Sequence, residues 1–493
     1  MLDHPVLPWP STEPYWLQKM PWQAETQAPL PEKADVVVVG AGVTGLSTAY
    51  WLRQLRPELK VVVIEARGVS SGATGRNGGL CWPGLNDSFR QAVARYGLPA
   101  AKKFIKFEYT SFNAMRDFIS RHCDTDGGAF DPQMTLMPQG ALLLFVTDDQ
   151  VRNGHMNLEA LKHAGLADGA IELTRDQVAN MTGSDSFLGG IQVKTVAILW
   201  AAKFVFALAR EATRPATEHG PVVDIHTFTR AQSVVRDPAT GLLTVDTSRG
   251  RITAANVVHA TNAWAWSILP AFRDRIIPVR NQVIFVRPPR AHPRLWDFIC
   301  SANNGYEYLS QRPNGDVILG GMRETVEGGE EGNPDDSTLN PKISSGLRRY
   351  LPETFEVFRE GGEEVHAEME WCGVMGFSED RLPFVGSLEG VLGKEEGRGQ
   401  WIAAGFTGHG EDRIYNCVCY HFEGPFLLSL KPILLNFIIL TGMTRTFLCG
   451  RAIAEMVTGM PVSDWFVDEF LPDHHASRRD MWRKLDVNAS AKL

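Results

Sequence analysis

The sequence predicts an α/β protein built around a Rossmann-type βαβ unit, with at least one further core. Three observations carry this prediction. The 493 residues exceed the roughly 100–200 of a single domain. A β-branched run at 34–39 leads directly into Gly40-Ala41-Gly42-Val43-Thr44-Gly45, and a helical pattern of apolar residues follows. A second β-branched run at 60–64 then ends in Glu65, so strand, glycine turn, helix and strand occur in register.

Composition and charge exclude several classes of protein. Apolar residues make up 44% of the chain and charged residues 22%, which is typical of a globular protein rather than a disordered one. The net charge of −8, without a long basic run, argues against nucleic acid as a partner. The seven cysteines form no CxxC pair, which favours a reducing compartment and predicts neither a disulfide framework nor a metal site.

Residues 1–33 predict an extended N-terminal arm. They hold seven prolines and three tryptophans but no arginine and no apolar h-region, so neither a signal peptide nor a mitochondrial presequence is expected. We expect the arm to lie over the surface, with Tyr15 and Trp16 as its anchors.

The glycine turn predicts that the βαβ unit binds a dinucleotide. Gly40 permits the tight turn, Gly42 lets the backbone approach a pyrophosphate, and Gly45 lets the helix pack on the strand. The helix N-terminus, with Val43 and Thr44, brings partial positive charge to the phosphates. Glu65, about 20 residues after the last glycine, is expected to bind the adenosine ribose.

The segment 68–79 indicates which dinucleotide is bound. Its sequence, Gly-Val-Ser-Ser-Gly-Ala-Thr-Gly-Arg-Asn-Gly-Gly, follows the ribose-binding acid directly. So many small residues suit a backbone that lies against the ribityl chain and ring of FAD, although a flexible surface loop is the alternative. The chain has no second GxGxxG motif, so the sequence gives no sign of a separate nicotinamide site. We therefore predict FAD as cofactor, with contacts from Ala66, Arg67, Ser71, Gly72, Gly78 and Gly79.

Several separated motifs give the chain a family resemblance over about residues 34–465. They are Gly75-Arg76-Asn77-Gly78-Gly79, Ser233-Val234, residues 257–263, Pro278-Val279-Arg280-Asn281-Gln282, Tyr308-Leu309 with 315–321, Trp371-Cys372-Gly373 through Gly386, and residues 405–410. With these motifs the sequence resembles the FAD-dependent oxidoreductases of the D-amino acid oxidase and sarcosine oxidase superfamily. The segment 75–79 looks most like the gamma-glutamylputrescine oxidase branch.

The resemblance implies a glutathione-reductase-like FAD-binding Rossmann domain interleaved with an α+β substrate domain. The substrate domain is expected to have a mixed, largely antiparallel sheet that roofs the flavin. The predicted boundaries are 34–112, 184–270 and 372–470 for the FAD domain and 113–183 and 271–371 for the substrate domain, followed by a tail at 471–493. Within the substrate domain, the acidic stretch 327–336 is expected to be a solvated loop.

The resemblance also implies further site residues. Those expected to contact the cofactor are Val234, Ala260, Thr261, Gly373, Asp380, Gly408, Gly410 and Thr444. The candidate catalytic residues are His409, Arg76 and Asn77. For His409 the alternatives are contact with the substrate and packing of its own loop. For Arg76 and Asn77 the alternatives are hydrogen bonds donated near flavin N5 or O4 and a structural role that holds the segment 68–79 in place.

The expected activity is oxidation of a C–N bond of an amine or amino-acid derivative. In the family, a hydride passes to flavin N5 and oxygen becomes hydrogen peroxide, so a small-molecule amine and oxygen are the expected partners. A dehydrogenase with another electron acceptor and a catalytically disrupted flavin-fold protein remain alternatives. No counterpart of the oxygen-activating lysine of sarcosine oxidases is recognisable near 303–306.

One departure from the family pattern bears on the substrate. Met375 stands where D-amino acid and glycine oxidases carry a carboxylate-gripping arginine, which disfavours simple D-amino acids. Arg381 either substitutes for that arginine or serves as an ion-pair residue elsewhere. No covalent flavin attachment site is recognisable. Cys81 lies near the segment 68–79, and we expect it to be a small buried hydrophobe.

Residues 411–442 read as an insertion between the Gly408-His409-Gly410 motif and the helix expected after it. Joining Gly410 to Met443 restores the family pattern. The segment is apolar but too short to span a membrane and is interrupted by Lys431-Pro432, so no membrane partner is predicted. A translated intron is the first hypothesis and a genuine lid loop the second.

The last three residues, Ala491-Lys492-Leu493, are chemically close to the Ser-Lys-Leu peroxisomal address. They predict a peroxisomal location, and the cytoplasm is the alternative.

Overall fold

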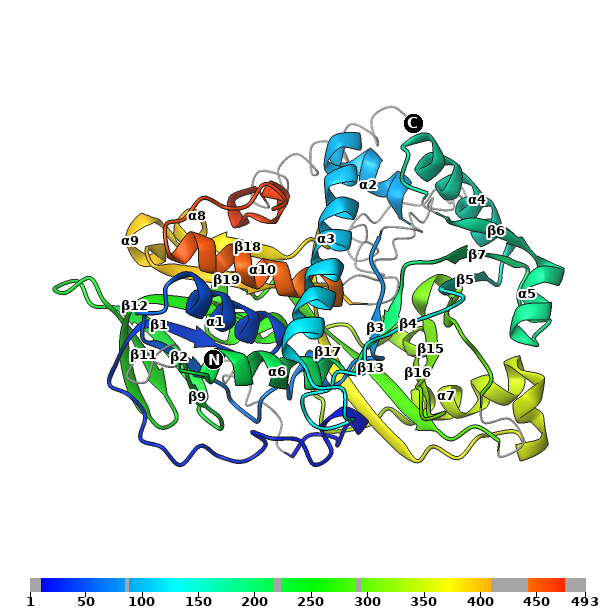
Figure 1. Cartoon of the computed structure of the whole chain (residues 1–493), viewed down its shortest axis with the longest axis horizontal. Helices are drawn as coiled ribbons and strands as arrows, with labels where there is room; N and C mark the ends of the chain where they lie inside the picture. The colour runs from blue at the N-terminus through cyan, green and yellow to red at the C-terminus, as the bar shows by residue number, and fades with distance from the viewer. Residues whose placement is uncertain are drawn as a thin grey trace, which may run out of the picture.

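The structure, a computed structural model, describes residues 10–84, 88–167, 169–215, 223–289, 294–408 and 442–474. Three sheets organise these residues, two of eight strands and one of three. Figure 1 shows the two large sheets side by side, with the long helix α3 standing between the parts of the molecule that they form.

The first large sheet contains the predicted βαβ unit. Its central strand β1 pairs in parallel with β2 and with β12. Because Val36 to Val39 are all buried, this strand needs apolar residues on both faces, as the sequence pattern predicted. The strands of the sheet are β1 (Lys33–Val39), β2 (Val61–Ile64), β9 (Asp224–His226), β10 (Ala231–Arg236), β11 (Leu243–Thr247), β12 (Gly250–His259), β18 (Phe384–Ser387) and β19 (Gln400–Ala404).

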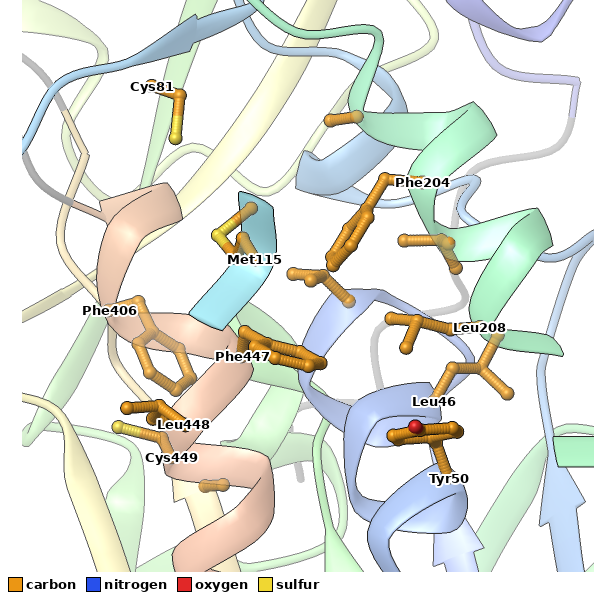
Figure 2. Packing of buried hydrophobic residues seen from close by; sticks show 14 of the residues in the cluster. Leu46, Tyr50, Cys81, Met115, Phe204, Leu208, Phe406, Phe447, Leu448 and Cys449 are labelled. Atoms are coloured by element: carbon orange, nitrogen blue, oxygen red, sulfur yellow. The ribbon is translucent and has the colours of Figure 1, made fainter. Parts of the chain in front are cut away.

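Four helices pack together over one face of this sheet. They are α1 (Val43–Leu55), α3 (Leu98–His122), α6 (Ala201–Thr213) and α10 (Gly442–Val457). Figure 2 shows Leu46, Phe204 and Phe447 from three of them converging in one apolar cluster. The helix that the sequence places after residue 442 is thus present and central to the core.

The second large sheet is mixed and largely antiparallel, as predicted. Its order is β17-β13-β16-β15-β14-β5-β7-β6, and only β14 and β5 are paired in parallel. The strands are β5 (Ala141–Phe145), β6 (Ile171–Thr174), β7 (Gly189–Val193), β13 (Ile276–Val286), β14 (Ile299–Ala302), β15 (Glu307–Gln311), β16 (Val317–Gly321) and β17 (Met369–Ser378).

Smaller elements complete the fold. The third sheet consists of β3 (Leu80–Cys81), β4 (Thr135–Leu136) and β8 (Ala197–Ile198). The remaining helices are α2 (Phe89–Tyr96), α4 (Asp148–His163), α5 (Arg175–Thr182), α7 (Pro341–Thr354), α8 (Glu389–Leu392) and α9 (Lys394–Gly397). In the part of the chain that the structure describes, no helix is both long and apolar enough to cross a membrane.

The chain alternates between the two large sheets, but the predicted boundaries assign two strands of the second sheet to the FAD domain. β7 falls in the segment 184–270 and most of β17 in 372–470, yet both pair in the second sheet. β17 pairs with β13 along almost its whole length. Such pairing between distant segments leaves no local signal in the sequence, and the boundaries there are corrected accordingly.

The N-terminal arm is built into the molecule more deeply than predicted. Figure 1 shows it running along the lower edge of both large sheets. Tyr15 and Trp16 are buried rather than laid on the surface, with Trp16 only 1% exposed. The Tyr15 hydroxyl donates to Asp316, and the Trp16 indole donates to the Asn77 carbonyl. The arm therefore joins the second sheet to the segment 68–79.

The acidic stretch 327–336 is not the solvated loop that the sequence suggested. Asp336 is 1% exposed and Glu330 9% exposed. Each carboxylate is paired with buried arginine, Asp336 with Arg67 and Glu330 with Arg280. Ion pairing across long sequence separations explains why composition alone misplaced this loop.

Candidate functional site

The turn between β1 and α1 requires glycine at two positions. Gly40 has a φ of +109°, and a Cβ there would lie 2.7 Å from the Ala260 carbonyl oxygen. A Cβ on Gly45 would lie 1.9 Å from the Gly40 carbonyl oxygen. Both positions therefore exclude a side chain for packing reasons. At Gly42, the N-cap of α1, the nearest atom to such a Cβ is the Thr74 hydroxyl oxygen at 3.2 Å, so this side of the turn is open.

A cavity of about 510 Å³ begins at this turn and continues beneath the second sheet. It brings together most of the predicted cofactor residues, although they come from distant parts of the chain. The predicted residues that line it are Gly40, Gly42, Val43, Thr44, Glu65, Ala66, Arg67, Gly72, Arg76, Asn77, Gly78, Ala260, Thr261, Gly373 and Gly408.

Six predicted cofactor residues do not line the cavity. Gly45 and Gly79 lie behind it, where Gly79 packs on Trp16 and on the Leu199 backbone. The others are Ser71, Val234, Asp380 and Thr444. Near Val234 the cavity wall is lined by Thr229 to Gln232, and near Thr444 it is lined by Met443 and Thr446.

Glu65 lies at the end of β2 and holds the turn together. Its carboxylate accepts hydrogen bonds from the backbone N–H groups of Ala41 at 2.9 Å and Arg67 at 3.0 Å. Two backbone donors fix the orientation of the carboxylate beside the cavity. This is the place at which an acid binds the adenosine ribose in dinucleotide folds.

The residues around the cavity fit a dinucleotide such as FAD. A Cβ on Gly72 would meet no atom within 4 Å, so the backbone there borders open space. The buried Thr261 hydroxyl also borders the cavity and has no hydrogen-bond partner among the residues that the structure describes. A bound ligand with polar oxygens would satisfy that hydroxyl and fill the open side of the turn.

Arg76 and Asn77 hold the segment 68–79, which we call the flavin loop. The Arg76 guanidinium donates to the Ser71 carbonyl at 2.8 Å and to the Cys372 carbonyl at 2.8 Å. Burial lowers the pKa of Arg76 to about 10. The Asn77 amide donates to the Thr74 carbonyl and accepts from the Gly79 N–H. Of the two roles expected for these residues, the geometry favours loop holding.

The roof of the cavity comes from the second sheet. Asn281 on β13 and Tyr308 on β15 both line it, and the Asn281 amide donates to the Tyr308 hydroxyl at 3.3 Å. The Tyr308 ring packs on Gly78 and Gly320, where any Cβ would collide with it. Burial raises the pKa of Tyr308 well above its usual value, so the phenol stays neutral. Neither residue was predicted as a site residue, although both lie in motifs that the sequence displays.

Met375 on β17 lines the cavity beside Gly408, while Arg381 does not. Arg381 is buried elsewhere, and its carbonyl accepts from Arg445. The proposal that Arg381 replaces the missing carboxylate-gripping arginine is therefore not supported by its position.

The loop after β19 lines the far end of the cavity with Phe406, Thr407 and Gly408. The Asn262 side-chain oxygen accepts hydrogen bonds from the N–H groups of Gly405 at 3.0 Å and Phe406 at 3.2 Å. The loop continues to Gly408, and α10 begins beside it: a Cβ on Gly442 would lie 2.9 Å from the Thr407 carbonyl oxygen. The predicted residues His409 and Gly410 lie outside the described residues, as does the C-terminal tripeptide.

Cys81 is buried near the flavin loop but does not line the cavity. Burial raises the pKa of its thiol to about 12, so it has little thiolate character. Its position agrees with the expected small buried hydrophobe.

Residues 35–411 match the DAO family, described as FAD dependent oxidoreductase. The chain belongs to this family. FAD is therefore its cofactor, as the glycine turn and the flavin loop predicted, and the chain is an FAD-dependent oxidoreductase.

Two bacterial relatives illustrate the similarity. The gamma-glutamylputrescine oxidoreductase of Escherichia coli is 24% identical over 410 residues, which cover 80% of this chain and 83% of the relative. The probable oxidoreductase OrdL of Rhizobium meliloti is 24% identical over 381 residues, 77% of this chain and 79% of the relative. These bacterial relatives lend no support to the predicted peroxisomal location.

Solved structures share the fold at low sequence identity. Glycine oxidase from Geobacillus kaustophilus superposes with a TM-score of 0.65 at 17% identity and covers 90% of this chain and 98% of its own. L-proline dehydrogenase from P. horikoshii gives 0.64 at 19% identity and covers 91% and 99%. The interleaved fold predicted from the sequence is thereby confirmed.

Proposed function

We propose that the protein oxidises a C–N bond of an amine that carries no carboxylate beside the reacting carbon, with oxygen as electron acceptor. The substrate would become an imine that water hydrolyses to a carbonyl compound and a free amine, and oxygen would become hydrogen peroxide. The single observation that carries the substrate class is the side-chain chemistry of the cavity roof.

Asn281, Tyr308 and Met375 make that roof neutral. An unpaired carboxylate buried against them would cost several kcal/mol, because no cation among these three compensates its lost hydration. Arg76 does not fill this role, since its donors are engaged by the Ser71 and Cys372 carbonyls. A neutral amine with an apolar chain meets no such penalty.

FAD supplies the electron-accepting chemistry when it is bound, and the protein supplies position and environment. Gly40 and Gly42 would let the backbone approach the pyrophosphate, and Glu65 would bind the ribose. Asn281 and Tyr308 would orient the substrate from the roof through neutral hydrogen-bonding groups. The buried walls would exclude water from the reacting atoms.

A screen of substrates tests the proposed class. The purified protein would be mixed anaerobically with alkyl amines, gamma-glutamylated amines, glycine and D-alanine, and the loss of flavin absorbance would be recorded. We expect amines without an adjacent carboxylate to bleach the flavin fastest. A higher kcat/KM for glycine or D-alanine than for every amine would contradict the proposal.

The acceptor is tested separately. We expect one hydrogen peroxide for each amine consumed under air. Fast bleaching with little peroxide would instead favour the dehydrogenase alternative, and the absence of any flavin spectrum would favour a disrupted site.

Met375→Arg sharpens the substrate test, since it places a guanidinium on the roof. A bidentate contact to a carboxylate should raise kcat/KM for glycine relative to an alkyl amine by about tenfold or more. Met375→Leu is the matched control, because it keeps the volume without adding charge. An unchanged ratio in the arginine variant would show that the roof does not set the substrate class.

A further inference from the structure

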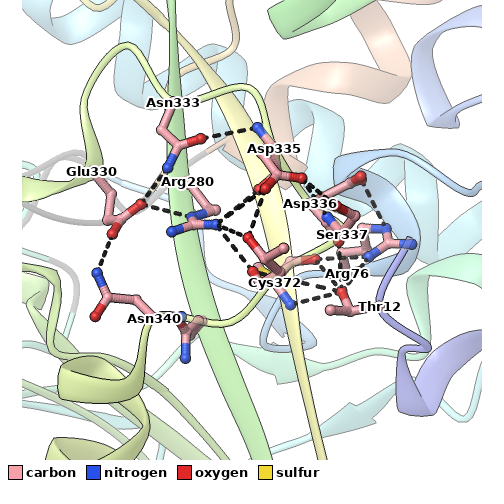
Figure 3. A network of polar contacts seen from close by, with 12 residues as sticks. Thr12, Arg76, Arg280, Glu330, Asn333, Asp335, Asp336, Ser337, Asn340 and Cys372 are labelled. Atoms are coloured by element: carbon pink, nitrogen blue, oxygen red, sulfur yellow. Dashed lines mark hydrogen bonds and ion pairs between the residues drawn. The ribbon is translucent and has the colours of Figure 1, made fainter. Parts of the chain in front are cut away.

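Asp336 lies buried between the two arginines of the flavin-loop region, Arg67 and Arg76. Figure 3 shows Asp336 beside Arg76 and Thr12. Its carboxylate accepts from the Arg67 Nη1 at 2.9 and 3.1 Å. The Arg76 Nε lies 3.5 Å from one of its oxygens. All three side chains are at most 5% exposed, so this is an interior ion cluster rather than a surface salt bridge.

Thr12 of the N-terminal arm joins the same cluster. Its N–H donates to the Asp336 carbonyl at 2.9 Å, and its hydroxyl oxygen accepts from the Arg76 Nη1 at 3.0 Å. The Cys372 N–H donates to this hydroxyl at 3.1 Å. One threonine thus ties together the arm, the flavin loop, β17 and the loop that carries Asp336.

The loop that carries Asp336 is in turn fixed to the roof. Arg280 on β13 donates to the Glu330 carboxylate at 2.6 Å and to the Thr338 carbonyl at 3.0 Å. The next residue, Asn281, lines the cavity. A set of polar contacts through the loop that carries Asp336 therefore connects the roof strand to the flavin loop.

Asp336 and Thr12 are not cavity residues, whereas Arg67 and Arg76 line the cavity. The two arginines also hold the flavin loop directly, since both donate to the Ser71 carbonyl. Asp336 and Thr12 can therefore influence a ligand in the cavity only through the arginines and the loop that these hold.

We propose that Asp336 and Thr12 are positioning residues for FAD, which hold Arg67 and Arg76 and thereby fix the flavin loop against the roof. Two buried guanidinium groups beside one carboxylate would repel each other without that carboxylate. They would then shift apart, and the loop that both arginines hold would move from the position that borders the cofactor.

Asp336→Asn tests this proposal, because the two possible roles of Asp336 change the dissociation constant of FAD in opposite directions. The variant adds one net positive charge next to the cavity. If long-range attraction to the pyrophosphate dominated, FAD would bind more tightly. If positioning dominates, as proposed, the dissociation constant of FAD rises by about tenfold or more, because one partner of a buried ion pair is removed. Flavin fluorescence on titration of apoprotein measures the constant directly.

Asp335→Asn is the matched control. Asp335 is the adjacent residue and loses the same charge, but its side chain is 37% exposed and lies 3.9 Å from the Arg280 Nη1. Its side-chain oxygen accepts from the Ser337 N–H, which an asparagine oxygen can also do. We expect its FAD affinity to stay within about twofold of the parent protein. An unchanged or smaller dissociation constant in Asp336→Asn, or an equal rise in both variants, would overturn the proposal.

Thr12 provides a second test if Asp336→Asn yields too little folded protein. Thr12→Val removes the hydroxyl at almost constant volume, and Thr12→Ser keeps it. We expect weaker FAD binding in the valine variant, recovery in the serine variant, and similar melting temperatures for the three apoproteins. Two results would contradict a positioning role for Thr12. One is equal FAD affinity in both variants, and the other is a fall in affinity that is matched by a fall in apoprotein stability.

A double-mutant cycle then asks whether Asp336 acts through Arg76. If it does, Asp336→Asn adds less to the FAD dissociation constant in an Arg76→Met background than in the parent protein. Fully additive effects would contradict action through Arg76.

Discussion

The two ends of the cavity are held by contacts of very different range. At the glycine turn, Glu65 accepts from Ala41 only 24 residues away along the chain. At the flavin loop, Arg76 donates to Cys372 at a separation of 296 residues, and the Trp371 indole donates back to the Arg76 carbonyl at 295. The first end is a property of one βαβ unit, whereas the second exists only when the two large sheets have come together.

This difference suggests that the two ends respond differently to mutation. A change in the glycine turn acts on the core of one unit or on the phosphate approach alone. A change at the roof or at α10 acts on contacts that hold distant segments together, and its effect should appear in the stability of the whole fold.

The variants Gly45→Val and Gly42→Val test the glycine turn. Of all the predictions, we expect the largest effect on folding from Gly45→Val. A side chain at Gly45 would overlap the Gly40 carbonyl oxygen at 1.9 Å, so α1 could not pack on β1. We expect no soluble folded protein. Gly42 faces open space apart from the Thr74 hydroxyl, so Gly42→Val should fold but lose FAD. Soluble yield, circular dichroism and the visible spectrum measure these outcomes. Full flavin retention in Gly42→Val would contradict the assignment of the phosphate turn.

The sequence predicted the glycine turn well because its causes are local. Gly40, Gly45 and Glu65 carry a pattern of spacing that stands on its own. In the structure the two glycines lie between β1 and the first turn of α1, and Glu65 directly follows β2. Val234 and Thr444 do not line the cavity although neighbouring residues do, because the face of a strand or helix that meets a cavity depends on the packing of its neighbours.

The roof and its supports were harder to predict because their causes are distant. Asp336 looked like part of a solvated acidic run, and only the approach of Arg67 and Arg76 makes it a buried ion. Asn281 and Tyr308 belong to motifs that the sequence displays, but nothing local shows that β13 and β15 bring them over one cavity. Trp16 and Thr12 were assigned to a surface arm for the same reason.

The buried pair between Glu108 on α3 and Arg445 on α10 tests the long-range end. Neither side chain is exposed, the Arg445 Nε donates to Glu108 at 2.8 Å, and the Gly84 N–H donates to the other carboxylate oxygen. Glu108→Gln leaves a buried guanidinium without its counter-charge. We expect a loss of about 3–5 kcal/mol in the free energy of unfolding, measured by urea denaturation.

The exposed pair Arg349–Glu353 on α7 is the control for that prediction. Glu353→Gln should cost about 0.5 kcal/mol or less, since both side chains remain in water. Similar losses in the two variants would show that α10 is not held by the buried pair.

His259, which directly precedes the cavity residue Ala260, gives the stability of the fold a pH dependence. It lies fully buried at the end of β12, its ring nitrogen Nε2 is 3.0 Å from the Gln400 side-chain oxygen, and burial lowers its pKa from 6.5 to about 4. Below pH 6.5 the unfolded chain binds a proton that the folded protein rejects. Stability should therefore fall as the pH drops from about 6.5 to about 4, by up to about 3 kcal/mol.

His259→Gln removes this titration while keeping a side-chain N–H donor, so its stability should decline less over the same pH range. His155→Gln is the control, since the pKa of the exposed His155 is raised by its hydrogen bond to Glu172 and its titration cannot cause a loss in acid. Parallel stability curves for the parent and His259→Gln would show that another group is responsible.

Deletion of residues 411–442 is expected to have the smallest effect on FAD occupancy and stability among the changes at the end of the cavity that distant segments form. Thr407, which precedes the segment, lies in contact with Gly442, the last residue of the segment and the first of α10, and α10 packs against β19. Residues 409–441 lie outside the described residues. We expect a direct join of Gly410 to Met443 to leave the cavity wall in place. Because the removed segment is strongly apolar, we expect a higher soluble yield, FAD occupancy at least equal to that of the full chain, and an unchanged melting temperature. Messenger RNA without the segment would support the translated-intron hypothesis. Loss of FAD on deletion, with messenger RNA that retains the segment throughout, would instead establish it as part of the working protein.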